Sequence, residues 1–436
     1  MAISTLLNFA NHIMLNIKET KTMTKPIILF LSILLFTSFQ KPIWGFFGHK
    51  RINRLAVFTL PSDMMPLFKK EIEYITEHAI DPDKRRFVVN TEGYRHYINL
   101  DRWSFLPQDK LEAQILHTDI FLITDKSDTL QLVDYQTIRK YKKDYYLKSK
   151  AIRRLFGRDS ITVADSFYRK FFIYNLSKIQ PDDPLSISTD SLKNLFQKEQ
   201  FSLKGIKAAY AKDRLTQSGI LPYHLQTVQK QLTDAFAKKD KNRILKLSAE
   251  LGHYIADAHV PLHTTSNYDG QLTGQSGIHA FWESRLPELF ADARYDFFVG
   301  KATYIEKPRE YFWNIIIASN KLALNVLQIE KKLNQKFPND KKYCLETIND
   351  VAIQKPCFDY SEAFHNELGG MVEARMQQAI LALGSAWYTA WVDAGQPDLT
   401  KLLESVPEIE VKKEEIMAEK AIKNGGIMIG RDEGKQ

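Results

Sequence analysis

The sequence predicts an all-α fold with one small β-containing insertion. Apolar residues recur at helical spacing over residues 309–335 and 359–392, and a long helical stretch begins after residues 219–222. By contrast, residues 120–135 alternate apolar and polar side chains around a short polar turn, which is typical of a small hairpin. With 436 residues, 44% of them hydrophobic, the chain can bury a large core in one or two domains.

Residues 1–40 have the pattern of an export signal. Three lysines precede an apolar run, PIILFLSILLF (residues 26–36), which is too short to span a bilayer comfortably. Met23 stands just before this run and could be the true start. We therefore treat residues 1–43 as a signal or upstream segment. We expect an exported protein, periplasmic or secreted, or one retained by an uncleaved N-terminal anchor.

The charge balance and the cysteine content narrow the range of functions. A net charge of +8 suits anionic partners such as phosphodiesters, nucleic acid or an anionic membrane surface. The only cysteines are Cys344 and Cys357, and no C-x-x-C pair is present, which argues against a cysteine-based zinc site. After export the two could form one disulfide, whereas in a reducing compartment they would stay free.

We predict a main domain over residues 44–395 and a charged C-terminal extension over residues 396–436. Residues from about 104 to 200 differ in composition and read as an insertion. Within it, residues 138–158 predict a basic helix whose lysines and arginines alternate with aromatic side chains. Such a surface could follow a phosphate backbone and stack on bases. The simpler interpretation is an amphipathic helix with a solvated basic face.

Residues 251–285 concentrate side chains that bind metals. This stretch holds four of the eleven histidines, with Asp257 and Glu283 placed among them. His253 and Asp257 are four residues apart, as are His279 and Glu283, so each pair lies on one face of a helix. Imidazole and carboxylate groups suit zinc, and this spacing aims two of them at one ion.

A third imidazole lies between the two pairs. Pro261 biases the preceding residue away from helix, so the first helix is expected to end near His259. His263 then extends from the segment just past that end. Two helical pairs and a further histidine within one short stretch predict a zinc site.

Four motifs together resemble a known family. They are WGFFGH (residues 44–49), the spacing of Asp81 and His96, HYIADAHVPLH (residues 253–263) and HAFWE (residues 279–283). The chain resembles the trinuclear-zinc superfamily that contains single-strand-specific nucleases and bacterial zinc-dependent phospholipases C. The resemblance implies a multi-helix phospholipase C/nuclease-type fold, and it runs from Trp44 to the 280s.

The resemblance also implies three Zn²⁺ ions and a set of ligands. The first ion would be held by Asp81, His96, His253 and Asp257, the second by His263, His279 and Glu283, and the third by Trp44 (through its backbone), His49 and Asp257. Asp81 would orient or deprotonate the attacking hydroxide. Lys84, or its neighbour Arg85, would neutralise charge on the phosphate. His259 is left over, and we interpret it as structural.

The two branches of this family suggest different substrates. The short interval from Trp44 to His49 resembles the nucleases, whereas the short interval from His263 to His279 and the final Glu283 resemble the phospholipases. We expect a zinc-dependent phosphodiesterase or endonuclease acting on single-stranded DNA, RNA or nucleotides. The alternative is a zinc-dependent phospholipase C acting on phospholipid head groups. A non-catalytic metal-dependent binding protein is the third hypothesis, and no protein partner is implied.

Overall fold

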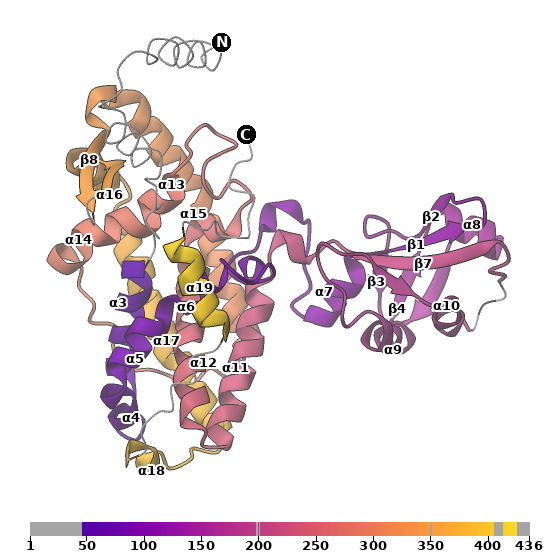
Figure 1. The fold of residues 1–436 in the computed structure, drawn as a ribbon, viewed down its shortest axis with the longest axis horizontal. Helices are drawn as coiled ribbons and strands as arrows, with labels where there is room; N and C mark the ends of the chain where they lie inside the picture. The colour runs from indigo at the N-terminus through magenta and orange to yellow at the C-terminus, as the bar shows by residue number, and fades with distance from the viewer. Residues whose placement is uncertain (1–45, 198, 200, 349–350, 405–412, 425–436) are drawn as a thin grey trace, which may run out of the picture.

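The computed structural model describes residues 46–404, except residues 198, 200, 349 and 350, together with residues 413–424. Trp44 and the predicted export signal lie outside these residues. Figure 1 shows an elongated body of helices and a smaller module of strands and short helices that projects from its side. Within the described part of the chain, no helix has both the length and the apolar character needed to span a membrane.

The helical body contains the longest helices of the chain. Its helices are α3 (Phe46–Ala56), α4 (Met65–Lys70), α5 (Ile72–Glu77), α6 (Asp81–Arg85), α11 (Leu221–Ala237), α12 (Lys241–His259), α13 (Ile278–Ala280), α14 (Leu286–Arg294), α15 (Pro308–Lys336), α16 (Phe358–Glu367), α17 (Met371–Asp393), α18 (Thr400–Glu404) and α19 (Lys413–Lys423). Short helical turns join them: η1 (Val57–Thr59), η2 (His78–Ile80), η3 (Gly93–Arg95), η4 (Leu100–Arg102), η5 (Thr216–Ser218), η6 (Pro261–Thr264), the π-helical η7 (Phe281–Arg285) and η8 (Asn339–Lys341).

The two predicted C-terminal helices are only partly continuous. The prediction over residues 309–335 is confirmed by α15. The helical pattern over residues 359–392 belongs instead to two helices, α16 and α17. Gly369 and Gly370 separate them with φ values of 59° and 79°, in the left-handed region where glycine carries no Cβ penalty.

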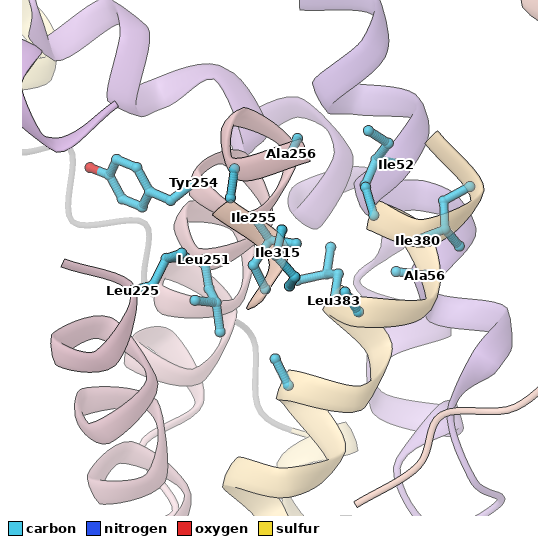
Figure 2. Close-up of a cluster of buried hydrophobic side chains, with 14 of the residues drawn as sticks. Ile52, Ala56, Leu225, Leu251, Tyr254, Ile255, Ala256, Ile315, Ile380 and Leu383 are labelled. Atoms are coloured by element: carbon cyan, nitrogen blue, oxygen red, sulfur yellow. The ribbon is translucent and has the colours of Figure 1, made fainter. Parts of the chain in front are cut away.

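Helix α12 lies at the centre of the body. Asp240 begins it, because its side chain accepts a hydrogen bond from the backbone N–H of Arg243 at 3.1 Å. The helix ends at His259, two residues before Pro261, as the sequence predicts. Helices α3, α11, α15 and α17 pack around it, and Figure 2 shows their apolar side chains meeting those of α12. Every residue from Leu247 to His259 is buried, the polar residues His253 and Asp257 among them.

One close contact sets the distance between α3 and α12. The side-chain amide of Asn53 donates a hydrogen bond to the carbonyl of Ala249 at 3.0 Å. A Cβ atom added to Gly252 would lie only 1.9 Å from Asn53 Oδ1. The glycine therefore lets the two helices approach, and their approach stacks the ring of His49 on that of His253 with centroids 4.0 Å apart.

The projecting module has its own hydrophobic core. Its elements are α7 (Lys110–Leu116), β1 (Thr118–Thr124), β2 (Thr129–Val133), β3 (Arg139–Tyr141), β4 (Asp144–Leu147), α8 (Lys150–Phe156), β5 (Ile161–Ala164), α9 (Asp165–Asn175), β6 (Leu185–Ile187), α10 (Thr189–Leu195) and β7 (Ile206–Asp213). The strands form two antiparallel sheets, in the orders β2-β1-β7-β6 and β3-β4-β5. Its buried apolar residues form a cluster distinct from the core of the helical body.

The prediction of an all-α fold is wrong, because the chain is mixed α/β. The module contains seven strands, and a third sheet, the hairpin β8 (Tyr343–Ile348) and β9 (Val351–Pro356), joins α15 to α16. We expected an irregular connection at this hairpin. A disulfide between Cys344 and Cys357 closes the base of the hairpin. Of the two states that the sequence allowed for these cysteines, paired or free, the structure has the paired one.

The basic helix predicted over residues 138–158 is also wrong, whereas the hairpin predicted over residues 120–135 is confirmed by β1 and β2. The basic segment forms strands β3 and β4 followed by the short helix α8. Arg139 and Tyr141 are exposed while Tyr145 and Leu147 are buried, so the burial alternates with the period of a strand. The aromatic side chains favour this extended pairing over a helix.

Substituting Gly252 tests the contact between α3 and α12. We expect Gly252→Ala to lower the free energy of unfolding by about 1–3 kcal/mol, because the new methyl group must displace Asn53. Gly48→Ala on α3 is the matched control, since its nearest neighbour would lie at 3.8 Å. Urea denaturation of the two variants measures the difference. Equal free energies of unfolding for the two variants would contradict a close contact between α3 and α12 at Gly252.

Candidate metal centre

Six helical elements of the body, together with the residue that follows η3, bring imidazole and carboxylate groups together. The groups belong to His49 on α3, Asp83 on α6, His96 directly after η3, His253 and Asp257 on α12, His263 on η6, His279 on α13 and Glu283 on η7. They fall into three sets that could each hold a metal ion: His49, His253 and Asp257; Asp83, His96 and His253; and His263, His279 and Glu283.

Asp257 is the central carboxylate. Its Oδ2 atom lies 3.0 Å from His96 Nδ1 and 3.4 Å from His253 Nε2. Its Oδ1 atom lies 3.5 Å from Nε2 of His49. The two oxygens therefore face different histidines from different helices.

Glu283 occupies the corresponding place in the second half of the cluster. Its Oε2 atom lies 2.7 Å from Nε2 of His279 and 3.3 Å from Nε2 of His263. Its Oε1 atom lies 3.2 Å from Nε2 of His49, so Glu283 links the two halves. The residue belongs to η7, a π-helical turn inserted between α13 and α14. Such turns are frequent at functional sites because they re-aim side chains.

Two backbone carbonyls fix the orientation of two imidazoles. His253 Nδ1 lies 2.9 Å from the carbonyl oxygen of Ala79, and His263 Nδ1 faces the carbonyl oxygen of His96. A carbonyl can only accept, so in each ring Nδ1 carries the proton and donates it. Nε2 of both rings then points its lone pair into the cluster. Metal-binding histidines are commonly oriented in this way.

The cluster is buried on one side and open on the other. His49, Asp83, His96, His253, Asp257 and His263 are buried, whereas His279 and Glu283 are partly exposed. Among the residues that the structure describes, the buried atoms His49 Nδ1 and His96 Nε2 have no hydrogen-bond partner. A ligand would reach the cluster from the side of His279 and Glu283.

Burial and charge shift the pKa values of these groups in opposite directions. Burial opposes protonation of His49, but its hydrogen bond to Glu283 and the charge of Asp257 raise its pKa to about 9. Burial and neighbouring His49 lower the pKa of His253 to about 3, so this imidazole is neutral. Burial disfavours the Asp257 carboxylate, but the nearby imidazoles hold its pKa below the ordinary range. The cluster thus contains buried carboxylate charge that calls for a cation.

Of the two aspartates on α6, Asp83 rather than Asp81 joins the cluster. Asp83 Oδ1 lies 3.7 Å from His96 Nδ1 and 3.8 Å from His253 Nε2. Residues two apart on a helix point in very different directions. The Asp81 carboxylate instead accepts hydrogen bonds from His78 Nδ1 and, at 3.1 Å, from Lys84 Nζ. The predicted roles of Asp81 and Lys84 stay predictions.

A buried polar network supports His96 from behind. Glu92 is fully buried and accepts hydrogen bonds from the hydroxyl of Tyr254 and from Arg85 Nε at 3.3 Å. Its Oε1 atom lies 3.7 Å from His96 Nε2. Burial opposes ionisation of Glu92, but His96 and Arg85 hold its pKa well below the ordinary range. Arg85 also donates to Glu250 at 2.6 Å, so its guanidinium is engaged in this network.

The sequence contains a signal for Glu92. Glu92 stands four residues before His96, the same interval that drew attention to His253 and Asp257. His259 has the contacts of a structural residue. It is buried, its Nδ1 lies 2.7 Å from the carbonyl oxygen of Ile255, and its backbone carbonyl accepts a hydrogen bond from Arg375 Nε at 2.9 Å. Burial lowers its pKa to about 3.

Comparisons of this chain with protein-family models, with curated proteins and with solved structures found no significant match. The geometry of the cluster and the motifs of the sequence therefore carry the functional inference.

The two aspartates of α6 can be separated by their effect on metal binding. We expect Asp83→Asn to weaken Zn²⁺ affinity at least about tenfold, because a charged group leaves the cluster. Asp81→Asn is the matched control and should bind Zn²⁺ as the unchanged protein does. Competition with a chromophoric chelator gives both affinities. A weaker Zn²⁺ affinity in Asp81→Asn than in Asp83→Asn would identify Asp81 as the ligand instead.

Proposed function

We propose that this protein is a zinc-dependent phosphodiesterase that hydrolyses phosphodiester bonds of single-stranded nucleic acid. The observation that carries the proposal is the convergence of five imidazoles and three carboxylates from distant segments into one partly open cluster. A purely structural cluster gains little from orienting two imidazole lone pairs inward, whereas a metal centre requires it.

The residues of the cluster fit zinc. Nitrogen and oxygen ligands suit this ion, and bonds of about 2.0–2.1 Å in a tetrahedron separate ligand atoms by about 3.3–3.4 Å. The separations of 3.4 Å between His253 Nε2 and Asp257 Oδ2, and of 3.3 Å between His263 Nε2 and Glu283 Oε2, agree with that value, whereas His279 Nε2 lies closer to Glu283 Oε2, at 2.7 Å. Asp257 is suited to bridge two ions because its oxygens face different histidines, whereas His253 belongs to two of the three sets and its one free lone pair, on Nε2, can serve only one ion at a time.

The chemistry proposed for the cluster is phosphoester hydrolysis. A zinc ion held by these residues would supply a Lewis acid for the phosphoryl oxygens and would lower the pKa of a bound water toward neutral pH. Burial disfavours the Asp81 carboxylate, but its hydrogen bond to His78 holds its pKa below the ordinary value. Asp81 therefore stays ionised and serves to orient its neighbours rather than to take up a proton. It holds Lys84, whose ammonium would offset negative charge on a phosphate.

Two further features support nucleic acid as substrate and export as destination. The net charge of +8 favours a polyanion. The disulfide between Cys344 and Cys357 suits an oxidising compartment, in agreement with the signal pattern at the start of the chain.

A phospholipase C activity is the second candidate. It is favoured by Leu272, which is 70% exposed on the connection between His263 and His279, because an exposed apolar side chain on this connection suits a lipid. Phospholipid head groups contain the same phosphodiester chemistry, so the ligands alone do not separate the two substrates.

A side-by-side assay tests the proposal. We expect the zinc-loaded protein to cleave single-stranded DNA, to lose this activity with EDTA and to regain it with Zn²⁺. RNA, a 3′-nucleotide and phosphatidylcholine vesicles are assayed in parallel. Diacylglycerol release without DNA cleavage would establish the phospholipase instead, and zinc-loaded protein inactive on all four substrates would sink both candidates.

A pair of glutamates on one continuous helical segment provides the matching variants. We expect Glu283→Gln to lower kcat/KM on single-stranded DNA at least about a hundredfold, since it links both halves of the cluster. Glu288→Gln, five residues further on, removes only a partner of Lys355 at 3.3 Å and should leave kcat/KM unchanged. Comparable losses in the two variants would point to a folding defect rather than to the metal centre.

A further inference from the structure

The projecting module presents a face that its own core does not use. Strands β3, β4 and β5 form a sheet whose inward side chains, Tyr145 and Val163 among them, pack into the module core. On the other face of the same sheet, Tyr141 is 72% exposed and Tyr146 is 43% exposed. Large aromatic side chains left in solvent on a sheet mark a surface that meets something else.

The register of the strands places these aromatic rings beside cationic side chains. Arg139 pairs with Tyr146 across β3 and β4, and both are exposed. Tyr141 pairs with Asp144 on the same face, and the ammonium of Lys142 in the β3–β4 turn lies 5.7 Å from the Tyr141 ring centroid. The two tyrosines are therefore diagonal neighbours, with side chains about 7–8 Å apart at their origins.

The cations of this face lack acidic partners, unlike a cation of the same strand that points inward. Lys140 is inward-facing and pairs with Glu112 at 2.7 Å and Asp165 at 3.1 Å. Among the residues that the structure describes, no carboxylate forms an ion pair with Arg139, Lys142 or Lys148, all of them exposed; Arg139 donates only to the carbonyl of Ile138, at 2.7 Å. The charge on the inward side is neutralised within the module, and the charge on the outward side is left available.

The charge of the whole module points the same way. Basic residues outnumber acidic ones between residues 109 and 214, and this excess makes up most of the net charge of +8. A positive potential concentrated on a projecting module attracts polyanions before they reach the helical body. The partner that fits the face is thus anionic and also offers flat apolar groups to the tyrosine rings.

We propose that the outward face of the β3–β4–β5 sheet binds single-stranded nucleic acid, with bases stacked on Tyr141 and Tyr146 and phosphates paired with Arg139, Lys142 and Lys148. This inference rests on the proposed function, since it assigns the module a second contact with the strand that the metal centre would cut. A duplex buries the flat faces of its bases and offers the face only phosphates. Stacking on exposed tyrosines therefore selects single strands.

A binding measurement tests this surface separately from catalysis. The probe is a fluorescein-labelled 20-nucleotide oligodeoxythymidylate with phosphorothioate linkages, titrated with the zinc-loaded full-length protein and followed by anisotropy. Removing two stacking rings in Tyr141→Ala/Tyr146→Ala should raise Kd at least about tenfold, since each base–aromatic stack contributes about 1–3 kcal/mol. Tyr174→Ala is the matched control, because Tyr174 is 75% exposed on α9 of the same module, and its Kd should stay within about twofold.

The charged side chains have a distinct signature. Arg139→Ser/Lys142→Ser should reduce the slope of log Kd against log salt by about 0.7 for each cation that contacts a phosphate. A duplex of equal length should bind at least about tenfold more weakly than the single strand. Inorganic polyphosphate should compete less well than unlabelled oligonucleotide at equal phosphate concentration.

Several outcomes would overturn the proposal. They are a Kd unchanged by the double tyrosine variant, equal loss in Tyr174→Ala, or polyphosphate competing as well as the oligonucleotide, which would indicate a plain polyanion surface. The result is independent of cleavage. If the protein cuts no DNA but its binding depends on the tyrosines, the binding surface is supported and the nuclease activity is rejected. If it cuts DNA but its binding does not depend on the tyrosines, the nuclease activity is supported and the binding surface is rejected.

Discussion

The structure depends on the burial of ionised carboxylate at the centre of a helical core. Asp257 sits on the part of α12 from Leu247 to His259, in which every residue is buried, and its pKa is held low, so a negative charge lies where water cannot solvate it. Such a charge is costly unless other groups compensate it. Glu283 adds a second one at the rim. The surrounding imidazoles supply part of this compensation. Two of them, however, direct a lone pair rather than a proton inward, and a lone pair cannot offset negative charge. A cation would do so.

This requirement explains how the neighbouring elements are placed. Helix α3 must come close enough for His49 to reach both carboxylates, and the absence of a side chain at Gly252 makes that approach possible. On the other side, Ala79 offers a carbonyl to His253 from the turn just before α6, so the segment that orients one imidazole also carries Asp83. Packing and ligand geometry are therefore set by the same contacts.

The sequence predicts the parts of this arrangement that depend on local spacing. The pairs His253–Asp257 and His279–Glu283 follow from helical periodicity, and the end of α12 follows from Pro261. The choice between Asp81 and Asp83 depends instead on the phase of a five-residue helix, which is fixed by how α6 packs and leaves little periodic signal. Likewise, residues 138–158 contain enough helix formers to suggest a helix, but the pairing of β4 with β5 decides their conformation. Long-range pairing of this kind overrides local propensity.

The connection between the module and the body joins the two surfaces that contact a substrate in our proposals. The chain returning from β7 donates hydrogen bonds to the segment that carries His96, from Ile220 N to the carbonyl of Tyr94 at 2.7 Å and from Leu221 N to that of Tyr97 at 3.1 Å. Gly219 makes this possible, because a Cβ there would lie 2.1 Å from the Tyr97 carbonyl oxygen.

The same segment also supports the cluster. Ile98 N donates to the carbonyl of His263 at 2.9 Å, while the carbonyl of His96 orients the His263 ring. One short stretch of backbone thus holds two imidazoles of the candidate metal centre and anchors the base of the module. A strand bound on the module would thus lie on an element that is anchored to the segment carrying His96.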